Sequence, residues 1–100
     1  MLTLRIGITD DTTPRDMDTY FTRIWCYRQP VVLVFDTTQC DSISFRRAMQ
    51  LKSVLDNHRE NSRRFIDHSR ILVKSHFTKN ILRTVLCIIR TERPVFVEKV

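Results

Sequence analysis

A single glycine, Gly7, stands among the 100 residues of the chain, and this scarcity excludes several kinds of enzyme. The loops that hold phosphate groups or dinucleotides need two or more glycines at fixed spacing, as does the G-x-S-x-G turn that carries the nucleophile of many hydrolases. None of these motifs is present. The sequence therefore contains no motif for binding a nucleotide or for acyl transfer.

Cysteine and histidine are also scarce, with three of each, and their spacing matches no metal site. The chain has no C-x-x-C or H-E-x-x-H motif, and no two histidines lie four residues apart. We expect Cys26 and Cys87 to be reduced, buried thiols, whereas Cys40 precedes an expected helix, where a thiolate is stabilised. We expect no metal, no cofactor and no catalytic residue, so the chain is not predicted to be an enzyme.

Long apolar runs are missing as well. Runs such as residues 31–35 are far shorter than the roughly 20 residues needed to span a bilayer, and the amino terminus lacks the basic and apolar regions of a signal peptide. With 42% hydrophobic and 28% charged residues, the composition is typical of one globular domain over residues 1–100. We therefore expect a cytoplasmic protein with no membrane insertion.

Positive charge dominates, with a formal net charge of +6, and it is concentrated in the second half. Residues 42–100 carry thirteen basic and five acidic side chains, which suits nucleic acid, an acidic protein, a membrane surface or simply a solvated face. Aromatic residues are not interleaved with these charges, and we expect Phe65 and Phe77 to be buried. The residues expected to contact phosphates are Arg59, Arg63, Arg64, Arg70, Lys74 and Lys79.

The hydrophobic pattern predicts a β-α-β-α-β-α-β order. Thr13 can cap a helix, and Pro14 suits the first helical position because its φ angle is already helical. Another helix is expected to begin at Asp41 or Ser42. The polar stretch 57–64 is expected to be a frayed helix end and a loop. The expected strands cover residues 2–6, 31–35, 71–73 and 94–97, and the expected helices 14–25, 42–55 and 76–89. This alternation predicts a four-stranded, mainly parallel sheet with helices mostly on one face.

The apolar run 31–35 ends at Asp36, and a polar segment follows. A run of this composition indicates an interior strand, and sites in α/β sheets gather where strand carboxyl ends meet helix amino ends. Asp36 either accepts N–H hydrogen bonds from the loop, or binds a metal or a phosphoryl group. Ser42 either caps the following helix or receives a phosphate, which Arg46 favours and Asp41 opposes.

The order of these segments resembles a STAS domain, the fold of bacterial anti-sigma-factor antagonists and of the cytoplasmic tails of sulphate transporters. Residues 4–7 and 32–37 are similar to the first and central strands of that family, and residues 41–44 stand where it has Asp-Ser-Ser-Gly. The resemblance implies that Ser42 matches the serine phosphorylated by a partner kinase and that this region meets the partner. Small STAS-like proteins also occur in large DNA viruses, which implies the virion or the host cytoplasm if the source is viral.

We therefore expect a small, non-enzymatic regulatory module that binds another protein through the amino end of its second helix. Association of identical chains through the uncovered sheet face is a further expectation. The alternative is a basic protein associated with nucleic acid or a virion structural protein. The expected interaction surface consists of Asp36, Thr37, Thr38, Gln39, Asp41, Ser42, Ser44, Arg46 and Arg47.

Overall fold

The strands pair side by side in the order in which they occur in the chain. The structure, a computed structural model, describes residues 1–41 and 43–100, and within them one parallel sheet of four strands has the order β1-β2-β3-β4. The predicted α/β class and parallel sheet are confirmed. The strands are β1 (Leu2–Gly7), β2 (Val31–Asp36), β3 (Ile66–Val73) and β4 (Val95–Lys99).

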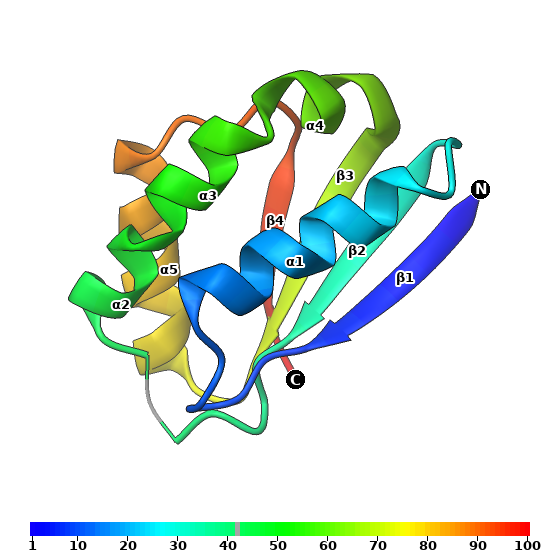
Figure 1. Cartoon of the computed structure of the whole chain (residues 1–100). Coiled ribbons are helices and arrows are strands. Elements are labelled where there is room, and N and C mark those ends of the chain that lie inside the picture. Colours follow the sequence, from blue (N-terminus) through cyan, green and yellow to red (C-terminus); the bar gives the residue numbers. More distant parts are fainter. Residues whose placement is uncertain (42) are drawn as a thin grey trace.

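The helices all lie over the same face of this sheet (Figure 1). Each right-handed crossover moves the chain one strand further in the same direction, so every connecting helix is delivered to the same side. Within the described residues, no helix is both long and apolar enough to cross a membrane. The helices are α1 (Pro14–Trp25), α2 (Phe45–Met49), α3 (Leu51–Asn57), α4 (Arg59–Phe65) and α5 (His76–Ile88).

Strand β2 lies in the interior of the sheet, as its composition predicts. It pairs in parallel with β1 on one side and β3 on the other. Val31 and Leu33 point into the helical layer and have no exposed surface, and they share a core cluster with Met17 and Phe21 of α1. The strand thus anchors α1 to the sheet and ends at Asp36.

The start of α1 is also confirmed. The Thr13 side chain accepts a hydrogen bond from the backbone N–H of Asp16, and the Asp16 carboxylate accepts one from the backbone N–H of Thr13. This reciprocal arrangement satisfies two backbone donors that a helix start leaves open. Pro14 occupies the first turn, where its missing N–H has no cost.

The segment between β2 and β3 differs from the prediction. The expected helix start at Asp41 is wrong, because Ser44 caps a helix that begins at Phe45. The alternative start, Ser42, lies outside the described residues. The polar stretch 57–64 is not a loop: residues 59–65 form α4. Arginine and glutamate are good helix formers. Ser62 is the residue that α4 buries, so this helix packs onto the protein without a broad apolar face.

Strand β3 begins five residues earlier than predicted, at Ile66. Its register against β2 shifts between Val31 and Val32, so that Asp67 is an extra residue on β3. A β-bulge of this kind interrupts the alternation of buried and exposed residues. The buried Ser69 then occupies a position where an apolar residue is expected, and the two irregularities together conceal the strand in the sequence.

Helix α5 exposes residues that the pattern placed inside. Phe77 is 70% and Ile88 55% exposed, whereas Leu82 is 4% exposed. The apolar residues of α5 span an arc wider than the side that the sheet covers. The prediction that Phe77 is buried is therefore wrong, as is the prediction for Cys26 and Cys87, which are both exposed.

The face of the sheet opposite the helices carries long charged side chains over its centre and the exposed Phe96 on β4. Val34 lies there between its register partners Arg5 and Arg70, yet only 7% of it is exposed. Arg5 pairs with Asp36, and Arg70 pairs with Glu98 at 2.6 Å. These ion pairs shield the apolar centre of a face that carries no helix in the described part of the chain.

His58 joins α1 to the junction of α3 and α4. An indole N–H can only donate, so Trp25 Nε1 donates to His58 Nδ1 at 3.0 Å. The proton of the ring therefore lies on Nε2, which donates to Asp18 at 2.7 Å. The imidazole also stacks against Phe21, with ring centroids 5.4 Å apart.

Replacing His58 with Ala should destabilise the fold by about 2 kcal/mol, because it leaves the Trp25 indole N–H without its acceptor and removes a stacked ring. Urea unfolding followed by tryptophan fluorescence measures the change. Asn57→Ala is the matched control, since Asn57 is exposed and adjacent, and it should change the free energy of unfolding by less than about 0.5 kcal/mol. Equal effects of the two substitutions would contradict this role of His58.

Candidate functional site

The Asp36 carboxylate is held by the loop that follows it. It accepts hydrogen bonds from the backbone N–H of Thr38 at 2.9 Å and from the Thr38 hydroxyl at 2.5 Å. Its other oxygen accepts from the Arg5 guanidinium. Donation by Thr38, then by Arg5, lowers the pKa of Asp36 from 3.8 to about 2. The geometry therefore supports the interpretation in which Asp36 holds the loop, with both of its oxygens engaged.

Replacing Asp36 with Asn should remove part of the pH dependence of stability. A folded-state pKa of about 2 against an ordinary 3.8 means that the ionised carboxylate stabilises the fold above pH 3.8, and that this contribution is lost as the pH falls towards 2. We expect the wild type to be more stable than Asp36→Asn at pH 6, and the difference to shrink between pH 4 and pH 2. Urea unfolding at stepped pH measures it.

Asp11→Asn is the control for this comparison, because Asp11 lies in an exposed turn; the variant should follow the wild type. A difference between wild type and Asp36→Asn that is the same at pH 6 and at pH 2 would contradict the assignment.

Thr37 and Cys40 are internal rather than presented to a partner. Thr37 is 6% exposed, and both its backbone N–H and its hydroxyl donate to the Leu72 carbonyl, which ties the end of β2 to β3. Cys40 is buried, and its thiol donates to the Ile8 carbonyl at 3.3 Å. Burial raises the pKa of the Cys40 thiol, so the expectation of a stabilised thiolate is wrong.

Arg47 fastens α2 to the loop that precedes α1. Its guanidinium donates to the carbonyl oxygens of Thr9 and Thr12 and lies 3.6 Å from a carboxylate oxygen of Asp10. Asp10 in turn accepts from the backbone N–H of Asp41. Arg47 is therefore part of the scaffold, whereas its neighbour Arg46 is exposed.

Replacing Arg47 with Met should lower the free energy of unfolding by about 1.5–3 kcal/mol, the range for lost hydrogen bonds that involve a charged group. Arg46→Met removes the same group one residue away and should change stability by less than about 0.5 kcal/mol. Thermal and urea unfolding of the pair measure the contrast. If both variants unfold at the same denaturant concentration, Arg47 does not have this structural role.

The predicted interaction surface is thus divided by the structure. Thr37, Asp36 and Arg47 serve the scaffold, and Ser44 caps α2 through the Arg47 N–H. Ser42, the predicted phosphorylation site, lies outside the described residues. The exposed members are Gln39, Asp41, Ser44 and Arg46.

The carboxyl edge of this sheet has no switch point. In doubly wound sheets a crevice opens where the strand order reverses, and ligands bind there. The order β1-β2-β3-β4 proceeds in one direction, so the loops after β1, β2 and β3 pack beside one another. Within residues 1–41 and 43–100, no group of three His, Cys, Asp or Glu side chains is placed to hold a metal ion.

The basic residues predicted to contact phosphates are spread over the molecule. Arg64 precedes β3 and Lys74 follows it, and a strand of eight residues separates them by about 25 Å. Arg59 is engaged with Asp56 and Glu92. Arg70 lies on the uncovered sheet face, Arg63 on α4 and Lys79 on α5. The structure does not bring these residues into one ridge.

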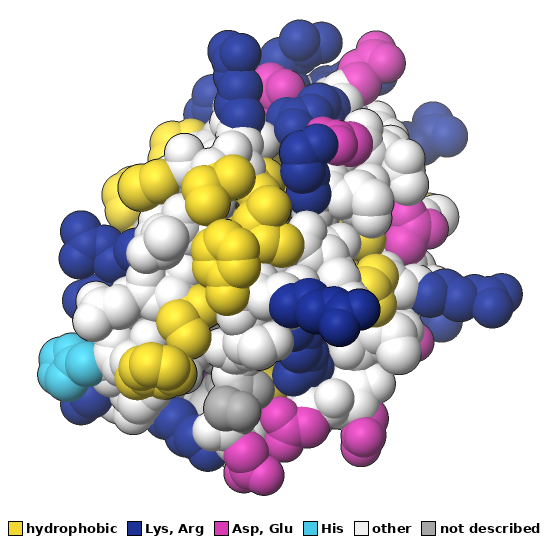
Figure 2. Space-filling view, turned by 90° about the vertical axis from the view of Figure 1, so that its left-hand side faces the viewer, with side chains coloured by type: hydrophobic (Ala, Val, Ile, Leu, Met, Phe, Trp, Pro, Cys, Tyr) yellow, Lys and Arg dark blue, Asp and Glu magenta, His cyan; other side chains and the backbone are white. Residues whose placement is uncertain are grey.

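A surface that the sequence analysis did not identify runs over α2 and α5. We call it the α2/α5 patch. Figure 2 shows it as a yellow band with dark blue side chains on both sides. Its signal in the sequence is the wide apolar arc of α5, which exceeds what one sheet covers. It consists of the exposed Phe45, Phe77 and Ile88 and the half-buried Met49 and Ile81.

The comparisons with known proteins identify no relative. No family model, no curated protein and no solved structure matches the chain. The resemblance to STAS domains therefore stays a hypothesis that rests on the sequence motifs.

Proposed function

We propose that the chain is a non-catalytic protein-interaction module whose α2/α5 patch binds an acidic amphipathic helix of another protein. The observation that carries the proposal is the exposure of large apolar side chains on these two helices: Phe77 is 70%, Ile88 55% and Phe45 45% exposed. Contiguous apolar surface of this kind marks interaction sites in globular proteins.

The patch has a geometry suited to a helix. Phe77, Ile81 and Ile88 recur at helical spacing along the 13 residues of α5, and Phe45 and Met49 extend the apolar surface onto the neighbouring α2. An amphipathic partner helix binds such a surface through apolar side chains at positions three, four and seven residues apart. The 13 residues of α5 span about 20 Å, so the apolar side chains can follow a partner helix over several turns.

The charge around the patch selects the partner. Neither α2 nor α5 contains an aspartate or glutamate, and they carry the exposed basic residues Arg46 and Arg83. Neither of these two has a carboxylate within 4 Å among the described residues. Charges without an internal partner remain available to carboxylates of another protein, and they favour fast and specific association.

The alternatives have less support. The sites predicted for nucleic acid are dispersed. The uncovered sheet face, predicted for self-association, carries the Arg5–Asp36 and Arg70–Glu98 ion pairs beside the exposed aromatic Phe96. The resemblance to STAS domains agrees with the location, because Phe45 and Arg46 lie at the amino end of α2, where that family meets its partner. A STAS-like regulatory role remains part of the proposal.

A designed helical peptide tests the proposal. The probe is a fluorescent peptide of about 14 residues, close to the average helix length, with leucines on one face and glutamates beside them. We expect saturable binding in fluorescence anisotropy, and at least tenfold weaker binding after Phe77→Ser combined with Ile88→Ser. Arg46→Glu combined with Arg83→Glu should weaken it similarly, and added salt should reduce the effect of the charges.

The controls separate this surface from others. The same peptide with lysine in place of glutamate should bind at least tenfold more weakly, and Tyr27→Ser, which removes an exposed aromatic outside the patch, should leave the affinity unchanged. Vesicles with anionic lipid and a DNA duplex are tested in parallel. Binding to either of these without binding to the acidic peptide would overturn the proposal.

A further inference from the structure

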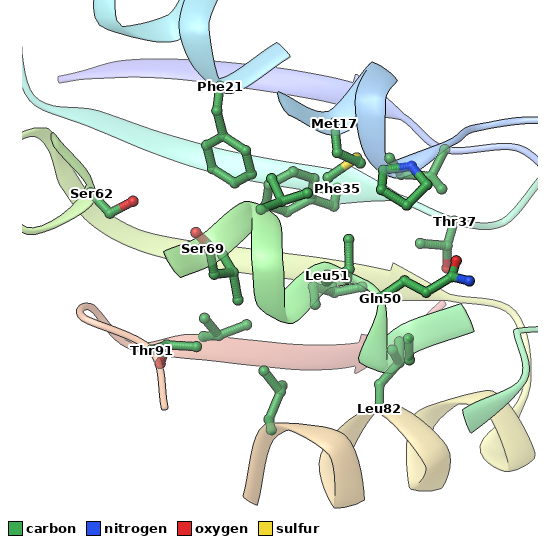
Figure 3. A pocket seen from close by; sticks show the side chains of 18 of the residues that line it. Met17, Phe21, Phe35, Thr37, Gln50, Leu51, Ser62, Ser69, Leu82 and Thr91 are labelled. Carbon is green, nitrogen blue, oxygen red and sulfur yellow. The ribbon is translucent and has the colours of Figure 1, made fainter. Parts of the chain in front are cut away.

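A cavity of about 150 Å³ lies inside the helical layer. Figure 3 shows its lining side chains between the strands and α3. Met17 and Phe21 come from α1, Phe35 from β2, Leu51 from α3 and Leu82 from α5. The cavity thus lies between the helical layer and the covered face of the sheet, is partly open to solvent, and has a predominantly apolar lining.

The cavity exists because small side chains stand where large ones would fill the core. Ser62 of α4 and Ser69 of β3 both line it, and they are 8% and 6% exposed. Its roof is α3, a helix of seven residues that ends at Asn57 and is separated from α2 by Gln50. This short helix contributes Leu51, Val54 and Leu55 to the lining.

One polar group in the cavity has no partner. The Ser62 hydroxyl is buried and makes no hydrogen bond, and Figure 3 shows it and the Ser69 hydroxyl at the same end of the lining. A buried hydroxyl without a partner costs about 1–3 kcal/mol. A molecule that fills the cavity and bonds to this hydroxyl regains that energy.

Charged groups near this end of the cavity are already engaged. Arg59 is bound to Asp56, to Glu92 and to the Arg90 carbonyl, and the Arg93 guanidinium donates to the Ile66 carbonyl. These contacts disfavour a charged ligand, because it would have to displace an existing partner.

From size and lining together, we propose that this cavity is a binding site for a small uncharged aromatic molecule with one hydroxyl group, which bonds to Ser62. An apolar cavity of about 150 Å³ has room for a single benzene ring. The hydroxyl places the polar end of the ligand at Ser62, and the ring lies among Phe21, Phe35 and Leu51. This site is independent of the α2/α5 patch.

Phenol and benzene are the probes, because they differ only in the hydroxyl. Methyl resonances of Leu51, Val54 and Leu82, which all line the cavity, are followed by NMR during titration. We expect both molecules to cause saturable shifts, with phenol binding about three- to tenfold more tightly, the range for one neutral hydrogen bond.

Ser62→Ala tests the polar contact. This variant is expected to fold, since it removes an unsatisfied buried hydroxyl and alanine is the best helix former. It should abolish the preference for phenol and keep the binding of benzene. Ser53→Ala, on the exposed side of α3, is the matched control and should retain the preference. Ser69→Leu, which fills the cavity, should weaken the binding of both probes at least tenfold.

Two results would overturn the proposal. One is the absence of saturable shifts with either probe in the folded wild-type protein. The other is a preference for phenol that persists in Ser62→Ala, because the hydroxyl of the ligand would then bind elsewhere.

Discussion

The parallel pairing of β2 between β1 and β3 is the constraint on which the rest of the structure depends. Because the strand order never reverses, every right-handed crossover places its helix on the same side. The protein therefore has two layers, with two hydrophobic clusters packed between them. The other side of the sheet has no helix in the described residues, and cross-strand ion pairs such as Arg70–Glu98 shield its apolar centre instead. The same strand order removes the crevice that doubly wound sheets offer to ligands at their carboxyl edge.

In this arrangement the surfaces left free for binding lie in the helical layer. At the strand ends, the polar groups of Asp36 and Thr37 are already hydrogen-bonded to the loop and to β3. The helices between β2 and β3 are short and interrupted, so they cover the sheet incompletely. Their outer side joins α5 in an apolar surface, and their inner side leaves a cavity. Both features arise because three short helices, rather than one long helix, connect β2 to β3.

Elements with strong local signals were predicted well from the sequence. The capping residues around Pro14 and the apolar composition of β2 act within a few residues, so their effect is independent of distant parts of the chain. The elements that were missed have weak or interrupted signals. Helix α4 has a polar sequence, and the alternation of β3 is broken by an extra residue at Asp67. At β3, packing against its neighbouring strands outweighs the local preference, whereas α4 follows the helix propensity of its arginine and glutamate residues.

Periodicity in the chain was enough to establish the alternation of strands with helical segments, the parallel sheet and which residues share a side of a helix. Which of those sides is covered was decided by packing. Phe77 and Leu82 are both apolar residues of α5, but only Leu82 reaches the sheet. Arg46 and Arg47 are identical in type, yet only Arg47 reaches the carbonyl groups of the loop before α1. A sequence pattern records the direction in which a side chain leaves its own backbone. What it meets there depends on segments that are distant in the chain, and folding alone brings them together.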